Sequence, residues 1–184
     1  MVQAVKPTDS SSRLQDTLPV SAEQLMEKLD QWEISYKCFK HNPLNTVKDS
    51  KSIQGQFLHR DDGGGHIKNL YLRDHKKNNI LLIADQDRKI DLKVLKKTIN
   101  MGRLSFGSPE RLMENLGVRP GAVTPFSMIT GVHHDVAFFL DLELKSCRKI
   151  YAHPLVNNLT LEISVTELEV FFSKIGVVPN WIII

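Results

Sequence analysis

The chain has 184 residues, of which 41% are hydrophobic and 24% charged, with a formal net charge of +3. Such a composition is typical of a single globular domain, and the small positive excess permits nucleic-acid binding without indicating it. Cys38 and Cys147 lie outside any CxxC motif, which argues against a disulfide framework or a zinc knuckle. Neither a membrane-length apolar run nor a signal-peptide pattern is present, so we expect a cytoplasmic protein without membrane contact.

The N-terminal part predicts a leader followed by a helix. Residues 1–18 contain a serine run and lack apolar periodicity, so we expect a flexible leader before one domain over residues 19–184. Ser21 and Gln24 have the spacing of a capping box that opens a helix. A short strand is expected over residues 35–40, and a short helix or a loop over residues 45–54.

The middle of the chain predicts a hairpin and two helices. A polar, glycine-rich loop over residues 56–65 leads into strands over residues 68–73 and 80–84, joined by a long polar turn. The second strand is continuously apolar, which predicts a central strand covered on both faces. Asp91 and Ser108 are predicted helix caps.

The C-terminal part predicts further strands and one helix. Residues 126–129 and 136–142 are expected to form a strand pair around a turn at residues 131–135, and residues 149–153 another strand. Thr166 and Glu169 suggest a capping box, and residues 181–184 a last strand. Hairpins interleaved with helices predict an α+β domain with a mixed, mostly antiparallel sheet flanked by helices.

Lys68 is the main candidate functional residue. It follows Gly63-Gly64-Gly65 at the start of a strand, where alternation puts it on the same face as Leu70 and Leu72. It is either a snorkelling lysine at a strand end or a functional cation at the mouth of a pocket. The sequence alone leaves both readings open.

Other charged groups are less specific. His41, His59 and His75 lack the spacing of metal ligands and are interpreted as surface residues, and His133-His134-Asp135 as a solvated turn. Lys93, Lys96 and Lys97 give one helix a basic face that would suit a phosphate backbone, although a plain surface helix has the same pattern.

Three segments together suggest a chemistry. The stretch 64–69, the loop 121–125 and His153 before Pro154 supply a cation, loop amides and an imidazole. Such groups suit ester hydrolysis by water, in which preorganised donors stabilise the developing oxyanion and no side-chain nucleophile is needed.

Four motifs resemble the YbaK/ProX-type prolyl-tRNA editing family. They are Gly-Gly-His-Ile-Lys-Asn-Leu at 64–70, Gly-Arg-Leu-Ser-Phe-Gly-Ser-Pro-Glu at 102–110, the stretch 116–126 and His-Pro-Leu-Val-Asn at 153–157. The resemblance implies a compact domain whose mixed sheet curves into a partial barrel. It also implies hydrolysis of mischarged prolyl-tRNA without cofactor or metal, with the tRNA(Pro) acceptor end and prolyl-tRNA synthetase as partners.

The resemblance also implies roles for individual residues. Lys68 matches a lysine thought to anchor the 3′-terminal phosphate and ribose, and Asn69 and His153 match neighbouring substrate contacts. Gly121 and Pro125 match the ends of a GxxxP loop whose backbone faces the aminoacyl ester. A 2′-hydroxyl of the tRNA is proposed to assist. The expected substrate-binding residues are His66, Gly65, Ser105, Phe106, Ala122, Val123, Thr124 and Pro125.

The wording of the motifs is similar to the alanine-specific ProX branch, so we expect a trans-acting deacylase of Ala-tRNA(Pro). Two alternatives stay open: a Cys-tRNA(Pro) deacylase of the YbaK branch, and a non-catalytic module that binds tRNA or a synthetase. His41-Asn42-Pro43 replaces the family's His-Pro-Pro, and residues 54–62 form a longer loop. Both departures precede Lys68 and bear on substrate size more than on activity.

Overall fold

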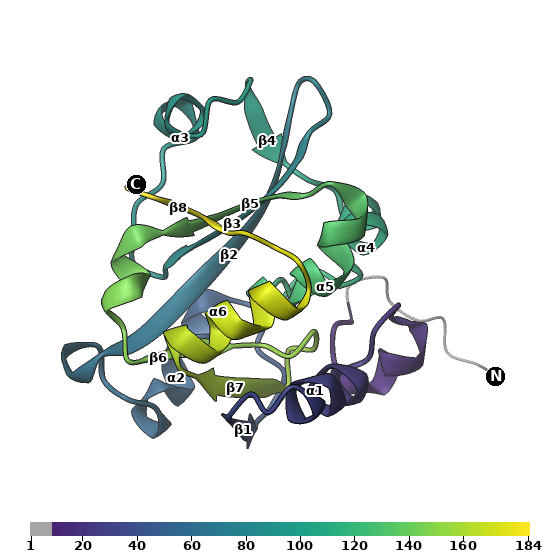
Figure 1. Ribbon diagram of the computed structural model, residues 1–184, viewed down its shortest axis with the longest axis vertical. Helices are drawn as coiled ribbons and strands as arrows, with labels where there is room; N and C mark the ends of the chain where they lie inside the picture. The colour runs from purple at the N-terminus through teal and green to yellow at the C-terminus, as the bar shows by residue number, and fades with distance from the viewer. Residues whose placement is uncertain (1–8) are drawn as a thin grey trace.

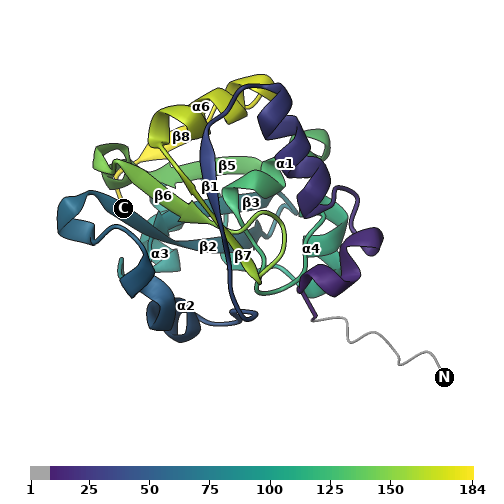
Figure 2. The ribbon, with the colours of Figure 1, turned by 90° about the horizontal axis from the view of Figure 1, so that it is seen from below.

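The computed structural model describes residues 9–184 and has one eight-stranded mixed sheet between two layers of helices. The sheet path runs β1-β7-β6-β2-β3-β5-β8, and β4 pairs with β2 beside it. Figure 2 shows α1 and α6 on one side of the sheet and α2 on the opposite side. The α+β prediction with a mixed sheet is confirmed.

The elements run along the chain as follows. The strands are β1 Tyr36–Lys40, β2 Gly64–Asp74, β3 Asn79–Asp85, β4 Leu104–Phe106, β5 Ala137–Asp141, β6 Lys149–Ala152, β7 Leu159–Ile163 and β8 Asn180–Ile182. The α-helices are α1 Ala22–Gln31, α2 Val47–Ile53, α3 Leu92–Thr98, α4 Pro109–Leu116, α5 Met128–Gly131 and α6 Val165–Lys174. The 3-10 turns are η1 Ser12–Thr17, η2 Gln54–Gln56, η3 Arg60–Asp62, η4 Pro125–Ser127, η5 Val132–His134 and η6 Leu142–Ser146.

The long β2–β3 hairpin crosses the molecule and separates two hydrophobic cores (Figure 1). The larger core packs α1, α4, α5 and α6 against the face that carries Tyr71, Leu81 and Ile83. The smaller core packs α3 against the face that carries Leu72 and Leu82. The prediction that β3 is central and covered on both faces is therefore confirmed.

One predicted C-terminal strand was wrong. Residues 126–129 were expected to be a strand, but they lie in η4 and α5, and the expected turn at residues 131–135 contains η5. The cause is local, because Thr124 accepts a hydrogen bond from the amide of Phe126 and Pro125 starts the helical turn. Short apolar runs fit a buried helix as well as a strand.

The cap of α6 also lies elsewhere than predicted. Ser164 is the N-cap and accepts from the Glu167 amide, whereas Thr166 lies inside the helix. The same serine directly follows β7, a strand that was not predicted, although Leu159, Leu161 and Ile163 alternate as a half-buried strand requires.

The predicted leader needs correction over residues 9–18. Its first eight residues lie outside the described part of the chain, but residues 12–17 form η1. The Asn157 amide donates to the Ser10 carbonyl at 3.0 Å, and the Ser12 amide donates to Asn158 Oδ1 at 3.1 Å. This segment is part of the domain.

None of the helices within residues 9–184 combines the length and the apolar character needed to cross a lipid bilayer.

Candidate functional site

A pocket opens where two neighbouring strands separate. β2 pairs with β6 through His66 and with β4 from Leu72 onwards, so within residues 9–184 this edge of β2 is unpaired from Ile67 to Leu70. The pocket at this edge encloses about 310 Å³, a size suited to the end of a ligand and not to a folded macromolecule. Its walls come from α2, β2, the end of β6, and residues Gly121 and Val123.

The strand register explains why residues distant in sequence meet here. His66 pairs with Tyr151, and both side chains therefore leave the same face of the sheet. Side chains alternate along a strand, so Lys68 and His153, two residues further on, share that face. Both line the pocket, together with Asn69.

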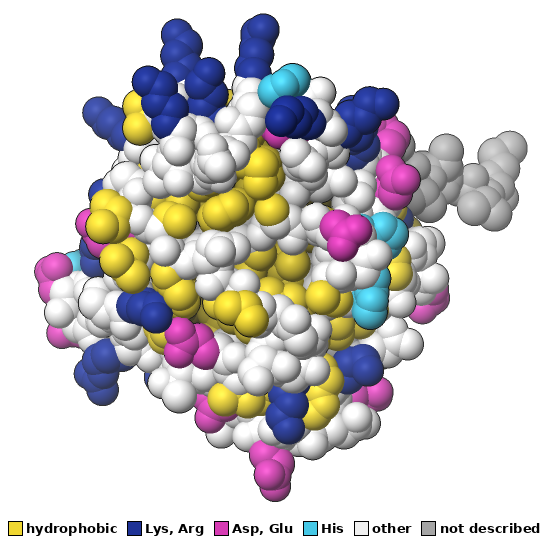
Figure 3. Space-filling view, turned by 45° about the horizontal axis from the view of Figure 1, so that its top comes forward, with side chains coloured by type: hydrophobic (Ala, Val, Ile, Leu, Met, Phe, Trp, Pro, Cys, Tyr) yellow, Lys and Arg dark blue, Asp and Glu magenta, His cyan; other side chains and the backbone are white. Residues whose placement is uncertain are grey.

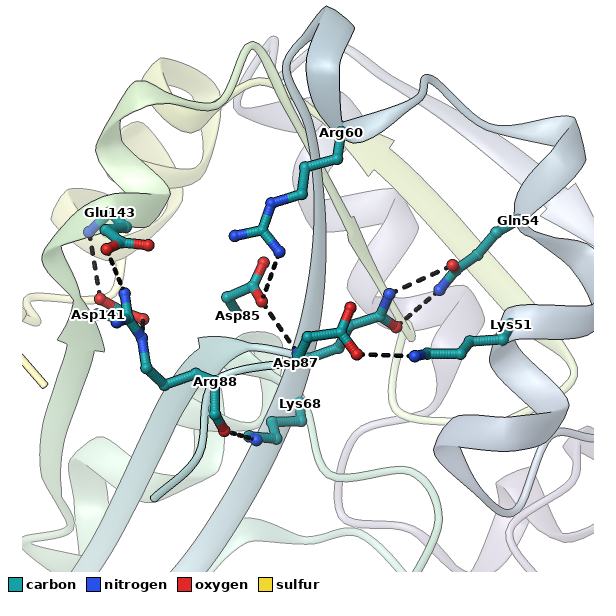
Figure 4. A network of polar contacts seen from close by, with 10 residues as sticks. Lys51, Gln54, Arg60, Lys68, Asp85, Asp87, Arg88, Asp141 and Glu143 are labelled. Atoms are coloured by element: carbon teal, nitrogen blue, oxygen red, sulfur yellow. Dashed lines mark hydrogen bonds and ion pairs between the residues drawn. The ribbon is translucent and has the colours of Figure 1, made fainter. Parts of the chain in front are cut away.

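Lys68 is not a snorkelling surface lysine. Its ammonium group donates a hydrogen bond to the main-chain carbonyl of Arg88, in the turn after β3, and its side chain is half-buried at the pocket wall (Figure 4). The lysine therefore has a defined direction, and a protein carbonyl occupies one of its three donor positions.

His153 is a neutral hydrogen-bond acceptor at the pocket. Burial lowers the pKa of His153 to about 4, so the ring carries no charge at neutral pH. Its Nδ1 lies 2.7 Å from the Leu159 carbonyl. Because a carbonyl only accepts, Nδ1 carries the proton and Nε2 presents a lone pair.

The loop at Gly121 supplies backbone donors. Gly121 has φ +92°, a conformation that favours glycine, and both it and Val123 line the pocket. Within residues 9–184, the amides of these two residues donate no hydrogen bond to the protein. They are therefore available to an acceptor such as an ester carbonyl.

Asn69 and His66 are also in the pocket wall. The Asn69 Oδ1 atom is buried and lacks a hydrogen-bond partner within residues 9–184. A buried unpaired acceptor is costly, which is a reason to expect a donor from a ligand there. Burial lowers the pKa of His66, and its Nε2 lies 3.2 Å from the Leu58 carbonyl.

Several predicted substrate residues lie away from the pocket lining. Gly65 is buried against β6, where an added Cβ would lie 2.5 Å from Ile150 Cδ1. Ser105 and Phe106 lie on β4, and Phe106 is 67% exposed. The remaining three belong to the loop 121–125 but are buried and lie outside the pocket lining: Ala122, Thr124 and Pro125. Lys93, Lys96 and Lys97 lie on α3, also outside the pocket lining.

Sequence reasoning missed an aromatic wall. Phe57 stacks on Tyr151 with ring centroids 4.5 Å apart, and His66 stacks on Tyr151 at 5.2 Å. The Tyr151 hydroxyl donates to Glu162 and accepts from the Leu58 amide, each at 2.7 Å. Burial and the Glu162 carboxylate raise the pKa of Tyr151 to about 12, so the phenol stays protonated.

His41 was interpreted as a surface residue, but the structure shows it partly buried beside His153. Its ring is half-buried, 6.0 Å from the ring of His153, and its Nε2 lies 2.8 Å from the Thr160 hydroxyl. The sequence feature that could have drawn attention to His41 is its position in His41-Asn42-Pro43, where the chain departs from the family motif.

The turn Asp85–Arg88 connects the pocket helix to the sheet (Figure 4). Lys51 of α2 forms an ion pair with Asp87 at 2.7 Å, and Gln54 and Gln86 exchange amide hydrogen bonds. Arg60 pairs with Asp85 at 3.0 Å. The same turn therefore fixes α2 over the pocket and receives the Lys68 ammonium.

Comparisons with known proteins show the family of this chain. The model of the family described as "Aminoacyl-tRNA editing domain" matches residues 41–171. The prolyl-tRNA editing protein ProX of Acetoanaerobium sticklandii is 34% identical over 79% of this chain and 86% of its own. The prolyl-tRNA synthetase associated domain-containing protein 1 of Xenopus laevis is 31% identical, over 84% of this chain and 91% of its own.

A solved structure supports the fold. A candidate trans-editing enzyme for prolyl tRNA synthetase superposes with a TM-score of 0.65 at 18% identity, covering 89% of this chain and 96% of that one. The family model matches most of the chain, and the ProX relative is more than 30% identical to it over most of both chains. The chain belongs to the aminoacyl-tRNA editing domain family.

Proposed function

We propose that the protein removes alanine from mischarged tRNA(Pro), acting in trans as an editing hydrolase. Membership of the family makes it an aminoacyl-tRNA deacylase, and the proposal concerns its substrate. The observation that carries it is that one pocket collects Lys68, Asn69, His153 and the Gly121 loop. Its partners would be the acceptor end of tRNA(Pro) and prolyl-tRNA synthetase, in the cytoplasm, where tRNAs are charged.

The groups suit the chemistry of ester hydrolysis. The amides of Gly121 and Val123 would polarise the ester carbonyl and stabilise the oxyanion that forms when water attacks the carbonyl carbon. The bond to the ribose oxygen then breaks, and the products are free alanine and a tRNA hydroxyl. The 2′-hydroxyl of the terminal ribose would assist, which agrees with a pocket that needs no protein nucleophile.

The remaining side chains would position the substrate. Lys68 offers a cation to the 3′-terminal phosphate, and its two other donor positions remain for that anion. His153 Nε2 offers an acceptor to the substrate amine or to water. Asn69 Oδ1, buried and unpaired in the free protein, offers a second acceptor.

Alanine is proposed over cysteine because of the ProX relative and the ProX-like motif wording. One methylene or a similar small group in an apolar pocket changes discrimination by only about 1–3 kcal/mol, so the preference must be measured. The non-catalytic binding module is the second class of candidate, and retention of Lys68, Asn69 and His153 together favours the enzyme.

Deacylation of Ala-, Cys- and Pro-tRNA(Pro) tests the proposal. We expect the highest kcat/KM with Ala-tRNA(Pro), and a fall of about 100-fold in Lys68→Ala, the scale on which one preorganised charged contact acts. Lys174→Ala, at the exposed C-terminal end of α6, is the matched control. Absence of hydrolysis of all three would reject the enzyme, and clearance of Cys-tRNA(Pro) alone would reject alanine as the substrate.

A further inference from the structure

Arg88 lies between Lys68 and a buried carboxylate. Lys68 of β2 pairs with Ala84 of β3. β3 and β5 are parallel, and Ile83 of β3 pairs with Leu140 of β5. The next residues along the two strands, Ala84 and Asp141, therefore lie beside each other. Lys68, Ala84 and Asp141 thus form a row on one face, and Arg88 reaches both ends of it (Figure 4).

The two ends of Arg88 make different contacts. Its carbonyl accepts from the Lys68 ammonium, and the turn holds this carbonyl in place because the Arg88 amide donates to the Asp85 carbonyl at 3.1 Å. Its guanidinium binds Asp141 Oδ2 at 3.1 Å and Glu143 Oε1 at 2.5 Å.

The buried Asp141 carboxylate requires a cation beside it. Its side chain is only 1% exposed, whereas that of Glu143 is 59% exposed and can be solvated. An unpaired buried carboxylate is strongly unfavourable and draws any cation within reach. Neighbouring strands lie about 4.8 Å apart, so two strand spacings separate the Lys68 and Asp141 backbones, a gap that the two side chains can bridge.

We propose that Arg88 is a positioning residue that neutralises Asp141 and so keeps the Lys68 ammonium at the pocket wall. The inference rests on the proposed function, in which Lys68 holds the terminal phosphate. Loss of the guanidinium would leave Asp141 unpaired, and Lys68 would turn from the pocket toward it. The ammonium would then be withdrawn from the substrate although the pocket itself is intact.

A double-mutant cycle tests this role with Ala-tRNA(Pro) as substrate. We expect Arg88→Met to lower kcat/KM at least about tenfold, and Asp141→Asn to change it less than about threefold, because Arg88 keeps Glu143. The double variant should recover to within about threefold of the unmodified protein, since no buried carboxylate remains to attract Lys68. Arg111→Met, at an exposed arginine of α4, is the control.

A merely structural role of the ion pair gives the opposite result. The double variant would then be as impaired as Arg88→Met or worse, and that outcome would overturn the proposal. Alanyl-adenosine, which lacks the phosphate, adds a second criterion. Arg88→Met should hydrolyse alanyl-adenosine with the same kcat/KM as the unmodified protein. An equal loss with both substrates would also overturn it.

The third readout does not depend on hydrolysis. The ¹³C resonance of the Lys68 ε-methylene, assigned with Lys68→Arg, should move in Arg88→Met and return in the double variant. An unmoved resonance would reject the positioning role. If the unmodified protein hydrolyses none of the charged tRNAs, the proposed function fails, and this resonance still decides whether Arg88 directs Lys68.

Discussion

At the scale of single residues, burial determines the charge of His153. Its Nδ1 proton is committed to the Leu159 carbonyl, and its pKa lies at about 4 because burial disfavours the charged ring. The residue therefore acts as an acceptor throughout the physiological pH range. The same burial makes the folded protein sensitive to acid.

The sign of that sensitivity follows from linkage. The folded-state pKa of His153 lies below the ordinary value of 6.5, so the unfolded chain takes up a proton first as the pH falls. The stability that this group contributes is complete above pH 6.5 and is lost between about pH 6.5 and 4. His153→Asn keeps a donor for the Leu159 carbonyl and does not titrate.

We expect urea unfolding at pH 7 and pH 4.5 to distinguish the two proteins. The unmodified protein should lose about 1–3 kcal/mol more of its unfolding free energy than His153→Asn over this interval. His66 and the carboxylates contribute equally to both proteins, and the comparison removes them. Parallel pH profiles would show that the pKa of His153 is not lowered in the folded protein.

Residue directions were predictable only where a regular element fixes them. Alternation along β2 placed Lys68 opposite Tyr71 correctly. Arg88 gave no such signal, because its role arises from a turn whose carbonyl and side chain contact two different strands. Asn69 was found through its motif, whereas its unpaired Oδ1 is a property of packing that only the structure contains.

At the scale of elements, the segment before α1 supports the pocket loop. The side chain of Asn158 accepts from the Ser12 amide at 3.1 Å and donates to the Ser12 hydroxyl at 2.7 Å. An added Cβ at Gly121 would lie 3.2 Å from Ser10 Oγ, so this segment adjoins the loop that carries the proposed oxyanion donors. Composition suggested a free leader because hydrogen bonds to distant turns leave no periodic pattern.

Removing this attachment should cost stability in proportion to the bonds lost. Asn158→Ala loses both hydrogen bonds and should lower the unfolding free energy by about 1–3 kcal/mol. Asn158→Asp keeps the acceptor for the Ser12 amide and should lose about half as much. Urea titration of the three proteins measures this order. Equal stability of Asn158→Ala and the unmodified protein would show that the contact does not hold the segment.

Element types were predictable where caps and periodicity agree. The helices capped by Ser21, Asp91 and Ser108 and the β2–β3 hairpin were found in place. The stretch 126–129 was assigned wrongly because a run of four residues, three of them apolar, fits either structure, and β7 was missed although its alternation is clear.

At the scale of the whole molecule, the sequence motifs indicated the fold but not the opening in its sheet. The pocket exists because β2 leaves β6 after His66 and meets β4 only at Leu72. This separation depends on the paths of three strands that are distant in sequence. No single segment of the sequence predicts this separation, whereas a resemblance to a family with the same fold implies it.

The basic end of the molecule suggests how a large substrate would lie. α3 packs on the face of the sheet that also carries Lys68, at the end of the molecule where β4 lies (Figure 1). Figure 3 shows Lys and Arg side chains gathered at this end. On α3, Lys93 and Lys97 are exposed and Lys96 is half-buried. A tRNA whose acceptor end enters the pocket could pass its phosphates over this helix.

Salt dependence of binding tests this path. Each phosphate that a lysine neutralises adds about 0.7–0.9 to the slope of log K against log[salt], so replacing Lys93, Lys96 and Lys97 with alanine should reduce the slope by about 1–3. The matched control replaces Lys28, Lys145 and Lys174, which lie on or beside the helices of the opposite face. We expect the control to keep the slope of the unmodified protein, because its lysines belong to or pair with the layer of α1 and α6, on the other side of the sheet from α3 (Figure 2). Equal slopes for both triple variants would assign the tRNA contact to another surface, while the pocket chemistry would be unaffected.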